Sequence, residues 1–325
     1  MAKMKTSRIV WLIVAASLTV LGLITIAVSI ALAGGDLMGF GTVEYETNSY
    51  VIEKDFTDVS IKTHTADVTV KRSDDETARV VCREESKLKH SVTVSDGALV
   101  IDVVDSRKWY EHINIGISFE DTSITVYLPD GAYGDLLINV NTGDTEIQKG
   151  LLFESIDVDS DTGDVTNYAW ATGAMRFKVT TGYITVSGAR ADSIGLKAST
   201  GNITLKDVNC AGEINHKCST GKALFENVNC DKFTSVGSTG DITLTAVKVT
   251  ELLAIARDTG DVRFNGSDAA EIAVETDTGD VTGTLLTEKI FFVTTDTGDV
   301  DVPESMVGGK CKITTDTGDV RLTVK

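Results

Sequence analysis

The chain has 325 residues, and its 48 acidic and 30 basic side chains give a formal net charge of −18 at pH 7. So acidic a surface excludes nucleic acid and anionic lipid as partners of the main body, because both require basic side chains, and it favours cations or basic protein surfaces. The five cysteines are too few and too scattered for a disulfide-stapled domain.

The N-terminal segment is predicted to be a single-pass membrane helix. Three basic side chains lie in residues 1–8, and an uncharged apolar run follows over residues 9–33, roughly the length that crosses a bilayer. Because the charges after this run are acidic, the positive-inside rule places residues 1–8 in the cytoplasm and everything after residue 33 outside the cell membrane. A cleaved signal peptide stays open as the alternative, since Ala31-Leu32-Ala33 resembles a cleavage site.

The next two segments are predicted to be a linker over residues 34–48 and an irregular β region over residues 49–134. Val59, Ile61, Val68 and Val70 in the β region alternate in strand fashion around Ala66, which takes the place that glycine has in the later repeats. Terminal units of repeat proteins are atypical, so this region is expected to cap a repeat array.

The rest of the chain, residues 135–325, is a repeat array marked by ten Thr-Gly pairs. Successive glycines of these pairs are always 19 or 20 residues apart: Gly143, Gly163, Gly182, Gly201, Gly221, Gly240, Gly260, Gly279, Gly298 and Gly318. A fixed period near 20 residues is typical of stacked architectures, in which each unit contacts mainly its two neighbours.

Apolar residues alternate on both sides of each glycine. The position seven residues before it is apolar throughout: Leu136, Ile156, Met175, Ile194, Ile214, Phe233, Leu253, Ile272, Phe291 and Cys311. The position five before is mostly apolar, and alternation resumes after the glycine, as at Val165 and Ile184. This period of two indicates two short strands around a turn. The predicted fold is all-β, a parallel β-solenoid of about ten rungs behind a β cap and one transmembrane helix.

Several motifs of the chain resemble a known family. The apolar anchor, Thr65-Ala66-Asp67-Val68, the segment from Ile124 to Pro129 and the repeated Thr-Gly-Asp-Val units are similar to the bacterial putative-adhesin family of β-strand-repeat proteins, a domain of unknown function, over roughly residues 50–325. The resemblance implies a surface β-solenoid without an assigned reaction. It also implies an association with bacterial envelope-stress systems.

An acidic column at the turns is the candidate metal site. Asp-Thr-Gly-Asp recurs in the last four repeats, which would align eight carboxylates along one edge: Asp258, Asp261, Asp277, Asp280, Asp296, Asp299, Asp316 and Asp319. Calcium takes six to eight oxygen ligands and would relieve the repulsion between stacked carboxylates. Ordinary turn chemistry is the competing interpretation, because aspartate commonly stabilises turns. No other cofactor is expected.

Cys210 and Cys230 fall in one column of adjacent rungs, nine residues after their glycines. Stacked neighbours lie about 4.8 Å apart, within the range of a disulfide. A bond between them and two buried thiols both stay open.

An enzyme is not expected. Coils of 19 or 20 residues leave little loop for a substrate cleft, and Arg257, Arg263 and Arg321 are the only basic candidates near the acidic column. His216 occupies an inward column, where a histidine is usually a core residue. The remaining histidines come from separate stretches and indicate no triad.

The predicted function is therefore a non-catalytic, adhesin-like binding or scaffold module at the bacterial cell surface. An accessory sensor or regulator of an envelope-stress system is the alternative, and a carbohydrate-active β-helix enzyme is a third. The partner is an unknown extracytoplasmic protein, glycan or envelope component. The last repeat stops seven residues after Gly318, so its open strand edges predict self-association through the C-terminal rung.

Overall fold

A computed structural model describes residues 6–32, 44–107 and 121–325, which fall into two compact units. The described part of the first is largely the helix α1 (Thr6–Leu32), and its segment Val10–Val28 is long and apolar enough to cross a membrane. The apolar helix predicted over residues 9–33 is thus confirmed as a helix, and a membrane span and a signal sequence both fit it. Most of the predicted tail (1–8) and linker (34–48) lies outside the described residues.

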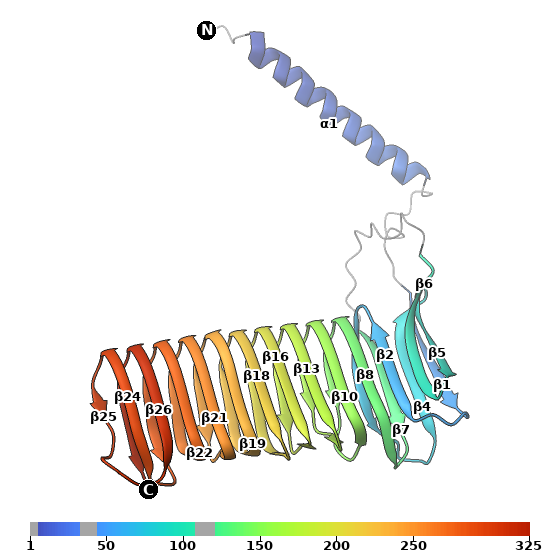
Figure 1. The fold of residues 1–325 in the computed structure, drawn as a ribbon. Helices are drawn as coiled ribbons and strands as arrows, with labels where there is room; N and C mark the ends of the chain where they lie inside the picture. The colour runs from blue at the N-terminus through green and yellow to red at the C-terminus, as the bar shows by residue number, and fades with distance from the viewer. Residues whose placement is uncertain (1–5, 33–43, 108–120) are drawn as a thin grey trace. The chain divides into compact units, whose positions relative to one another are not determined.

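The second unit, residues 46–105 and 121–325, is a stack of parallel two-strand rungs with irregular strands at one end (Figure 1). The array contains β8 (Ala132–Thr142), β9 (Thr145–Ile147), β10 (Leu152–Thr162), β11 (Val165–Asn167), β12 (Trp170–Ala171), β13 (Ala174–Thr181), β14 (Ile184–Ser187), β15 (Arg190–Ala191), β16 (Ser193–Thr200), β17 (Ile203–Cys210), β18 (Glu213–Thr220), β19 (Ala223–Thr239), β20 (Ile242–Thr245), β21 (Lys248–Thr259), β22 (Val262–Thr278), β23 (Val281–Leu285), β24 (Lys289–Thr297), β25 (Val300–Asp301), β26 (Gly309–Thr317) and β27 (Val320–Val324). The predicted all-β solenoid is confirmed.

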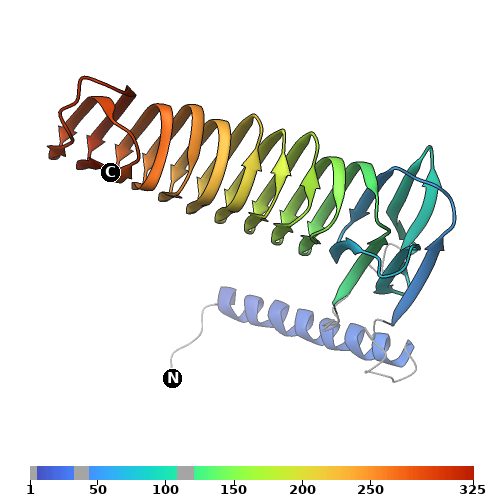
Figure 2. The same cartoon turned by 90° about the horizontal axis from the view of Figure 1, so that it is seen from below.

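The core of the stack follows the columns read from the sequence. The residues seven before each repeat glycine are buried, from Leu136 to Cys311, except Phe291, which is half-buried. The column three before the glycine also faces inward, and sequence reasoning missed it because it mixes apolar residues such as Val140 and Val179 with Ser160, Arg257 and Thr276. Side chains of three inward columns on one strand and of at least one column on the next fill the interior. Figure 2 shows the coiled path of the backbone around it.

The repeat glycines are required by both conformation and space. Gly182 has φ of 146°, and a Cβ added there would lie 2.0 Å from the carbonyl oxygen of Gly163 in the preceding rung. Any side chain would therefore collide with backbone that cannot yield. The Gly182 N–H donates to the Thr200 carbonyl of the following rung at 3.0 Å, so the glycine column is also part of the parallel ladder.

The irregular end is built from β1 (Tyr45–Ile52), β2 (Asp58–Thr63), β3 (Ala66–Arg72), β4 (Ala78–Glu85), β5 (Leu88–Ser95), β6 (Ala98–Asp105) and β7 (Thr122–Leu128). The strands β2 and β3 form the rung anticipated around Ala66, because Val59 and Ile61 pair in parallel with Leu136 and Ile138 of β8. The strand β4 pairs antiparallel with β7, and β5 with β6. The strand β1 pairs with β4, and its first residues lie inside the predicted linker, which therefore does not end at residue 48 as expected.

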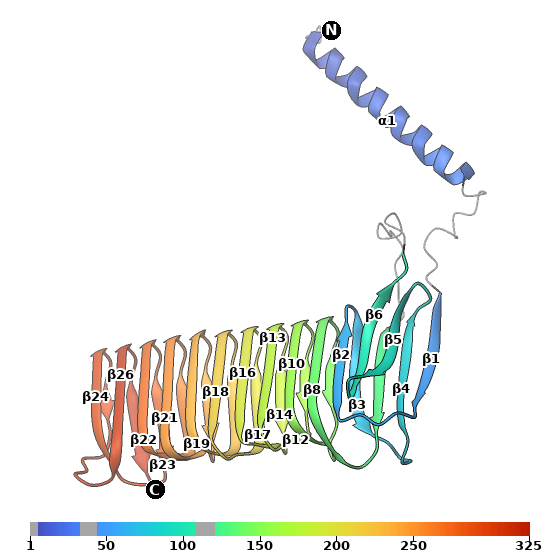
Figure 3. The same ribbon diagram turned by 45° about the vertical axis from the view of Figure 1, so that its right-hand side comes forward.

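The last rungs do not stack in chain order. The strand β26 pairs with β22 on one side and β24 on the other (Figure 3). The strand β27 likewise pairs with β23 and β25. The chain thus leaves β23, passes over one rung position to form β24 and β25, and returns to fill the gap with β26 and β27. The expectation that the C-terminal repeat forms an open end is therefore wrong, because this repeat has a paired rung on each side.

The open end of the array is the rung β24–β25. Phe291 and Val293 are only partly buried, while Phe292 is 53 % and Val300 48 % exposed. Cys311 and Val320, the register partners of Phe291 and Val300 in the β26–β27 rung, are 0 % exposed, so the exposure of Phe291 and Val300 comes from the missing neighbour, whereas Phe292 faces outward like its partner Lys312. This rung leaves apolar core residues and one strand edge uncovered.

Candidate functional site

Aspartate directly follows seven of the ten repeat glycines, and in six of these rungs the aspartate forms a hydrogen bond to a neighbouring rung. Its Oδ1 accepts the backbone N–H of the equivalent residue in the next rung, as Asp144 does from Asp164 and Asp261 from Asp280, at 2.8 and 3.0 Å. Asn202 does the same for Lys222 at 2.9 Å. These post-glycine aspartates do more than the sequence suggested, since their carboxylates satisfy backbone donors that the parallel ladder leaves free.

The pre-turn aspartates, two residues before the glycine, are exposed. In spatial order they are Asp258, Asp277, Asp316 and Asp296, so the acidic edge is continuous but not in chain order. Among the described residues, none of the eight predicted ligands belongs to a group of three or more acidic, histidine or cysteine side chains with ligand atoms within 4.8 Å. Arg321 contacts Asp319 at 2.7 Å and Asp299 at 3.8 Å, which already relieves part of the repulsion at that end.

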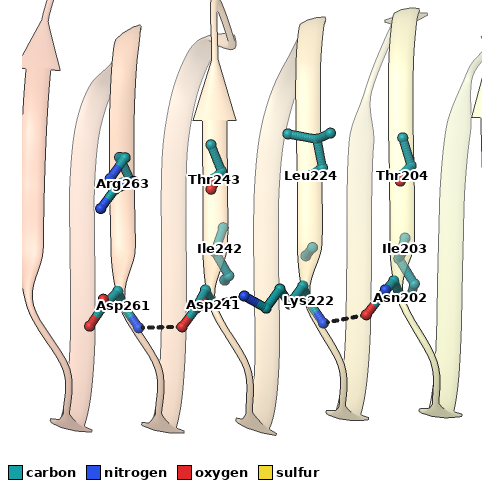
Figure 4. Close-up of a pocket in the computed structure, with 11 residues that line it drawn as sticks. Asn202, Ile203, Thr204, Lys222, Leu224, Asp241, Ile242, Thr243, Asp261 and Arg263 are labelled. Atoms are coloured by element: carbon teal, nitrogen blue, oxygen red, sulfur yellow. Dashed lines mark hydrogen bonds and ion pairs between the residues drawn. The ribbon is translucent and has the colours of Figure 1, made fainter.

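The middle rungs carry a groove of about 390 Å³ where the acidic column is interrupted. Figure 4 shows two rows of its side chains along the rungs: a turn row of Asn202, Lys222, Asp241 and Asp261, and a strand row of Thr204, Leu224, Thr243 and Arg263. Successive residues of each row lie in successive rungs. The groove is therefore a repetitive surface that crosses four rungs.

The groove has charged residues at both ends and an apolar residue, Leu224, between them. Lys222 Nζ lies 3.0 Å from Asp241 Oδ2, and this hydrogen bond is the main cause that lowers the pKa of the Asp241 carboxyl. Leu224 is 39 % exposed between the two charged ends. Of the three arginines singled out from the sequence, Arg263 alone lines this groove.

The other arginine in this region, Arg257, points into the core. It is 3 % exposed, and its guanidinium nitrogens donate to Ser235 Oγ at 3.2 Å and to the Cys218 carbonyl at 3.4 Å. Ser235 Oγ also lies 2.7 Å from Nδ1 of His216, whose pKa is lowered to about 3 by burial and by the nearby Arg257 charge. Because His216 and Ser235 are almost fully buried, this serine–histidine contact is closed to a substrate.

A second buried cluster lies in the cap and was missed from the sequence. Cys82, Glu84 and His90 place ligand-type atoms within 4.8 Å of one another. Glu84 accepts from the His90 backbone N–H at 2.6 Å and from Asn48 at 2.8 Å, and His90 Nδ1 lies 2.8 Å from Glu84 Oε2. His90 Nε2 lies 3.0 Å from Thr63 Oγ1. Protein partners thus occupy both ring nitrogens, which explains the cluster as a hydrogen-bonded core. The alternation Cys-x-Glu in one strand was its only signal.

All five cysteines are free and buried thiols. Cys210 and Cys230 do lie in adjacent rungs, next to the paired residues Asn209 and Asn229. Of the two open alternatives, the structure has the buried thiols. Burial raises the pKa of Cys230 to about 12, which keeps this thiol protonated and unreactive.

The stacked two-strand rungs, the glycine-aspartate turn and the antiparallel cap define a class of capped parallel β-solenoids. Within that class, the chain belongs to the Toastrack DUF4097 family, whose model matches residues 56–218 and 211–325. This membership confirms the resemblance drawn from the Thr-Gly-Asp-Val repeats. None of the curated proteins matches the chain.

Three of the solved structures similar to this chain come from Bacteroides and Parabacteroides strains. A "putative adhesin" from Bacteroides fragilis NCTC 9343 is 15 % identical with a TM-score of 0.42, covering 86 % of this chain and 97 % of its own. A "putative adhesin" from Parabacteroides distasonis ATCC 8503 is 15 % identical at 0.46, covering 84 % and 98 %. A "putative lipid binding protein" from the same strain is also 15 % identical at 0.46, covering 75 % and 98 %.

Proposed function

We propose that the protein is a membrane-anchored extracytoplasmic binding module that acts without catalysis. The observation that carries this proposal is the filled interior: the inward columns of the array are occupied by side chains, so a ligand contacts outer surfaces. The groove through Lys222, Leu224 and Arg263 offers such a surface across four rungs. Bacterial relatives named as adhesins support a surface location.

The proposed orientation of the protein in the membrane rests on α1 and on the charged residues that flank it in the sequence. If α1 spans the membrane with residues 1–8 inside, protease added to intact cells removes the solenoid and leaves a short membrane-bound fragment. Protection of the solenoid until the cells are opened would contradict this orientation. Release of the whole solenoid into the medium without protease would indicate a cleaved signal peptide.

The groove is tested by site-specific photocrosslinking in intact cells. A photoreactive residue at Leu224 is expected to form a discrete covalent adduct with an envelope component. Leu137, which is 42 % exposed on a different strand face of the array, provides the matched control position. Equal adducts at both positions, or none at Leu224, would count against the groove as the binding surface.

We propose calcium only for the pre-turn aspartates, because they are exposed and stacked, whereas three of the four predicted post-glycine carboxylates, Asp261, Asp280 and Asp319, already accept backbone N–H groups. Titration calorimetry with calcium chloride compares the protein with an Asp258→Asn/Asp277→Asn/Asp316→Asn variant. A saturable heat that the variant loses supports the site, and no saturable heat in the parent eliminates it.

Self-association is proposed at the β24–β25 rung and not at the C-terminal repeat. The segment from Ile290 to Thr295 is apolar or β-branched and contains no charge or proline, and its outer edge pairs with no other strand of the described chain. Such an edge is a template for another strand. Two copies placed antiparallel about Val293 would bring no like charges face to face, since Asp296 of one copy would lie opposite Ile290 of the other.

A further inference from the structure

A pocket near the capped end of the array differs from the rest of the surface in its aromatic and cationic character. It has a volume of about 460 Å³ and is lined by the turns after β9, β11 and β14 in three successive rungs. Its aromatic side chains are Tyr168 and Trp170, which are 38 % and 44 % exposed. Exposed aromatic rings in a concave site are typical of ligand-binding pockets.

The indole of Trp170 is held in one orientation. Its Nε1–H donates to the Gly188 carbonyl of the next rung at 2.7 Å, and the Arg190 guanidinium lies 4.7 Å from the centre of the indole. Leu152 is the register partner of Trp170 in the preceding rung. A ring fixed by both neighbours loses little conformational entropy when a ligand packs against it.

The charge of this pocket is opposite to that of the protein. Lys149 is the only charged residue in its lining, and Arg190 stands at Trp170. Among the described residues neither forms an ion pair, and the pocket lining contains no carboxylate, whereas Lys222 in the groove pairs with Asp241. Two cations beside exposed aromatic rings, in a lining without carboxylates and in a chain of net charge −18, favour an anionic ligand.

We propose that this pocket binds a carboxylated glycan, a chain of acidic sugars such as uronic acids. The C–H face of a sugar ring would pack on Tyr168 or Trp170, and its carboxylate would receive charge-assisted hydrogen bonds from Lys149 and Arg190. Because the rungs advance by about 4.8 Å, close to the length of one sugar ring, successive sugars can follow successive turns. The site is separate from the groove at Leu224, and either can fail without the other.

The test uses the full-length protein in detergent, with Trp11→Phe and Trp109→Phe so that Trp170 is the only tryptophan and can be excited selectively. The probe is oligogalacturonate, and its methyl ester serves as the uncharged control with the same rings. Saturable change of Trp170 emission with the acid, and binding about tenfold weaker or more with the ester, is the expected result. Binding should also weaken as sodium chloride rises, because the contact is ionic and exposed.

Two variants separate this site from general charge attraction. Lys149→Gln is expected to weaken oligogalacturonate binding about tenfold, roughly the loss of one charge-assisted hydrogen bond. Lys178→Gln removes an equal charge that already pairs with Asp159 at 2.7 Å, and it should leave binding unchanged. Circular dichroism confirms that both variants fold. No saturable signal, equal binding of the ester, equal loss in both variants, or selective binding of a fatty acid instead would overturn the proposal.

Discussion

Oδ1 of Asp280 accepts the backbone N–H of Asp319 at 2.8 Å across 39 residues of sequence, whereas Asp261 and Asp280 make the same contact across 19. The doubled separation marks the position that the chain passes over before it returns. The same type of hydrogen bond therefore joins rungs that are consecutive in the sequence and also the two rungs, β22–β23 and β26–β27, that are not. It also gives the post-glycine aspartate a role that does not depend on a ligand.

Replacing Asp280 distinguishes this role from simple acidity. Asp280→Ala should lower the free energy of unfolding by about 1 kcal/mol, because the Asp319 N–H loses its acceptor. Asp280→Asn should retain most of the stability, since the amide oxygen still accepts. Urea unfolding followed by circular dichroism measures both, and Asp277→Ala, at an exposed pre-turn position, is the control expected to stay within about 0.5 kcal/mol. Equal losses for the Ala and Asn variants would contradict the hydrogen-bond role.

Two neighbouring glycines separate conformational strain from steric exclusion. Both have positive φ, 146° at Gly182 and 63° at Gly188, but a Cβ meets the Gly163 oxygen at 2.0 Å in the first and nothing within 4 Å in the second. Gly188→Ala should cost about 1 to 2 kcal/mol for the left-handed conformation alone. Gly182→Ala should cost clearly more. Thermal unfolding of the two variants checks the order, and similar melting temperatures would show that the rungs can shift apart at little cost.

Removing the buried charge of Arg257 should stabilise the protein. Burial lowers the pKa of Arg257, and no carboxylate pairs with it among the described residues, so its charge is poorly compensated. Arg257→Met keeps much of the side-chain volume and should raise the free energy of unfolding by about 1 kcal/mol or more. Arg176→Met, at an exposed arginine 3.9 Å from Asp157, is the matched control with little expected change. A lower melting temperature for Arg257→Met would show that its two hydrogen bonds outweigh the desolvation of the charge.

The stability of the protein should fall in mild acid through His216. Its pKa in the folded state is lowered from 6.5 to about 3, so between these values the unfolded chain binds a proton that the folded protein excludes. The contribution of His216 is complete above about pH 6.5 and is lost as the pH decreases towards 3. His216→Gln should remove this part of the dependence of unfolding free energy on pH between pH 4 and 7. His64→Gln, at an exposed histidine, should leave the dependence unchanged. Unfolding midpoints at each pH provide the measurement, and an unchanged slope in His216→Gln would assign it to other groups.

Self-association at the open rung should respond to a single edge charge. Phe292→Lys places a lysine on the β24 edge, where lysine commonly blocks strand pairing, and should shift the protein towards monomer in light scattering. Leu137→Lys adds the same charge on an exposed site of another strand and should not. A monomeric parent at high concentration would remove the proposal, and equal effects of both variants would indicate a non-specific charge effect.

The period of the repeats made the architecture predictable, because every glycine turn repeats the same steric demand and every inward column alternates with period two. The order of the last rungs was not predictable, since Gly279, Gly298 and Gly318 are spaced like all the others. Local pattern specifies that a rung forms but not which neighbour it joins. One signal existed: Pro303, the only proline in the array, follows β25 on the open rung, where a missing N–H costs least.

The candidate sites were less predictable than the fold. The sequence predicted the acidic edge. It did not predict the hydrogen bonds that Asp261 and Asp280 accept from backbone N–H groups of the next rung. It singled out Arg257 as a basic residue near that edge, although the side chain points inward through the space left by Gly237. Tyr168 and Trp170 gave no periodic signal, because their pocket depends on three turns coming together. The link to envelope stress stays a prediction from family resemblance.

The exchange of the last two rungs also constrains how the molecule can be completed during synthesis. Earlier coils can be added in the order in which they leave the ribosome, each on the one before. The β24–β25 coil emerges first but has no adjacent surface until residues 309–324 have been made and inserted. Completion of the stack therefore requires a non-vectorial step, in which the later β26–β27 coil must be made before the earlier β24–β25 coil can join the stack.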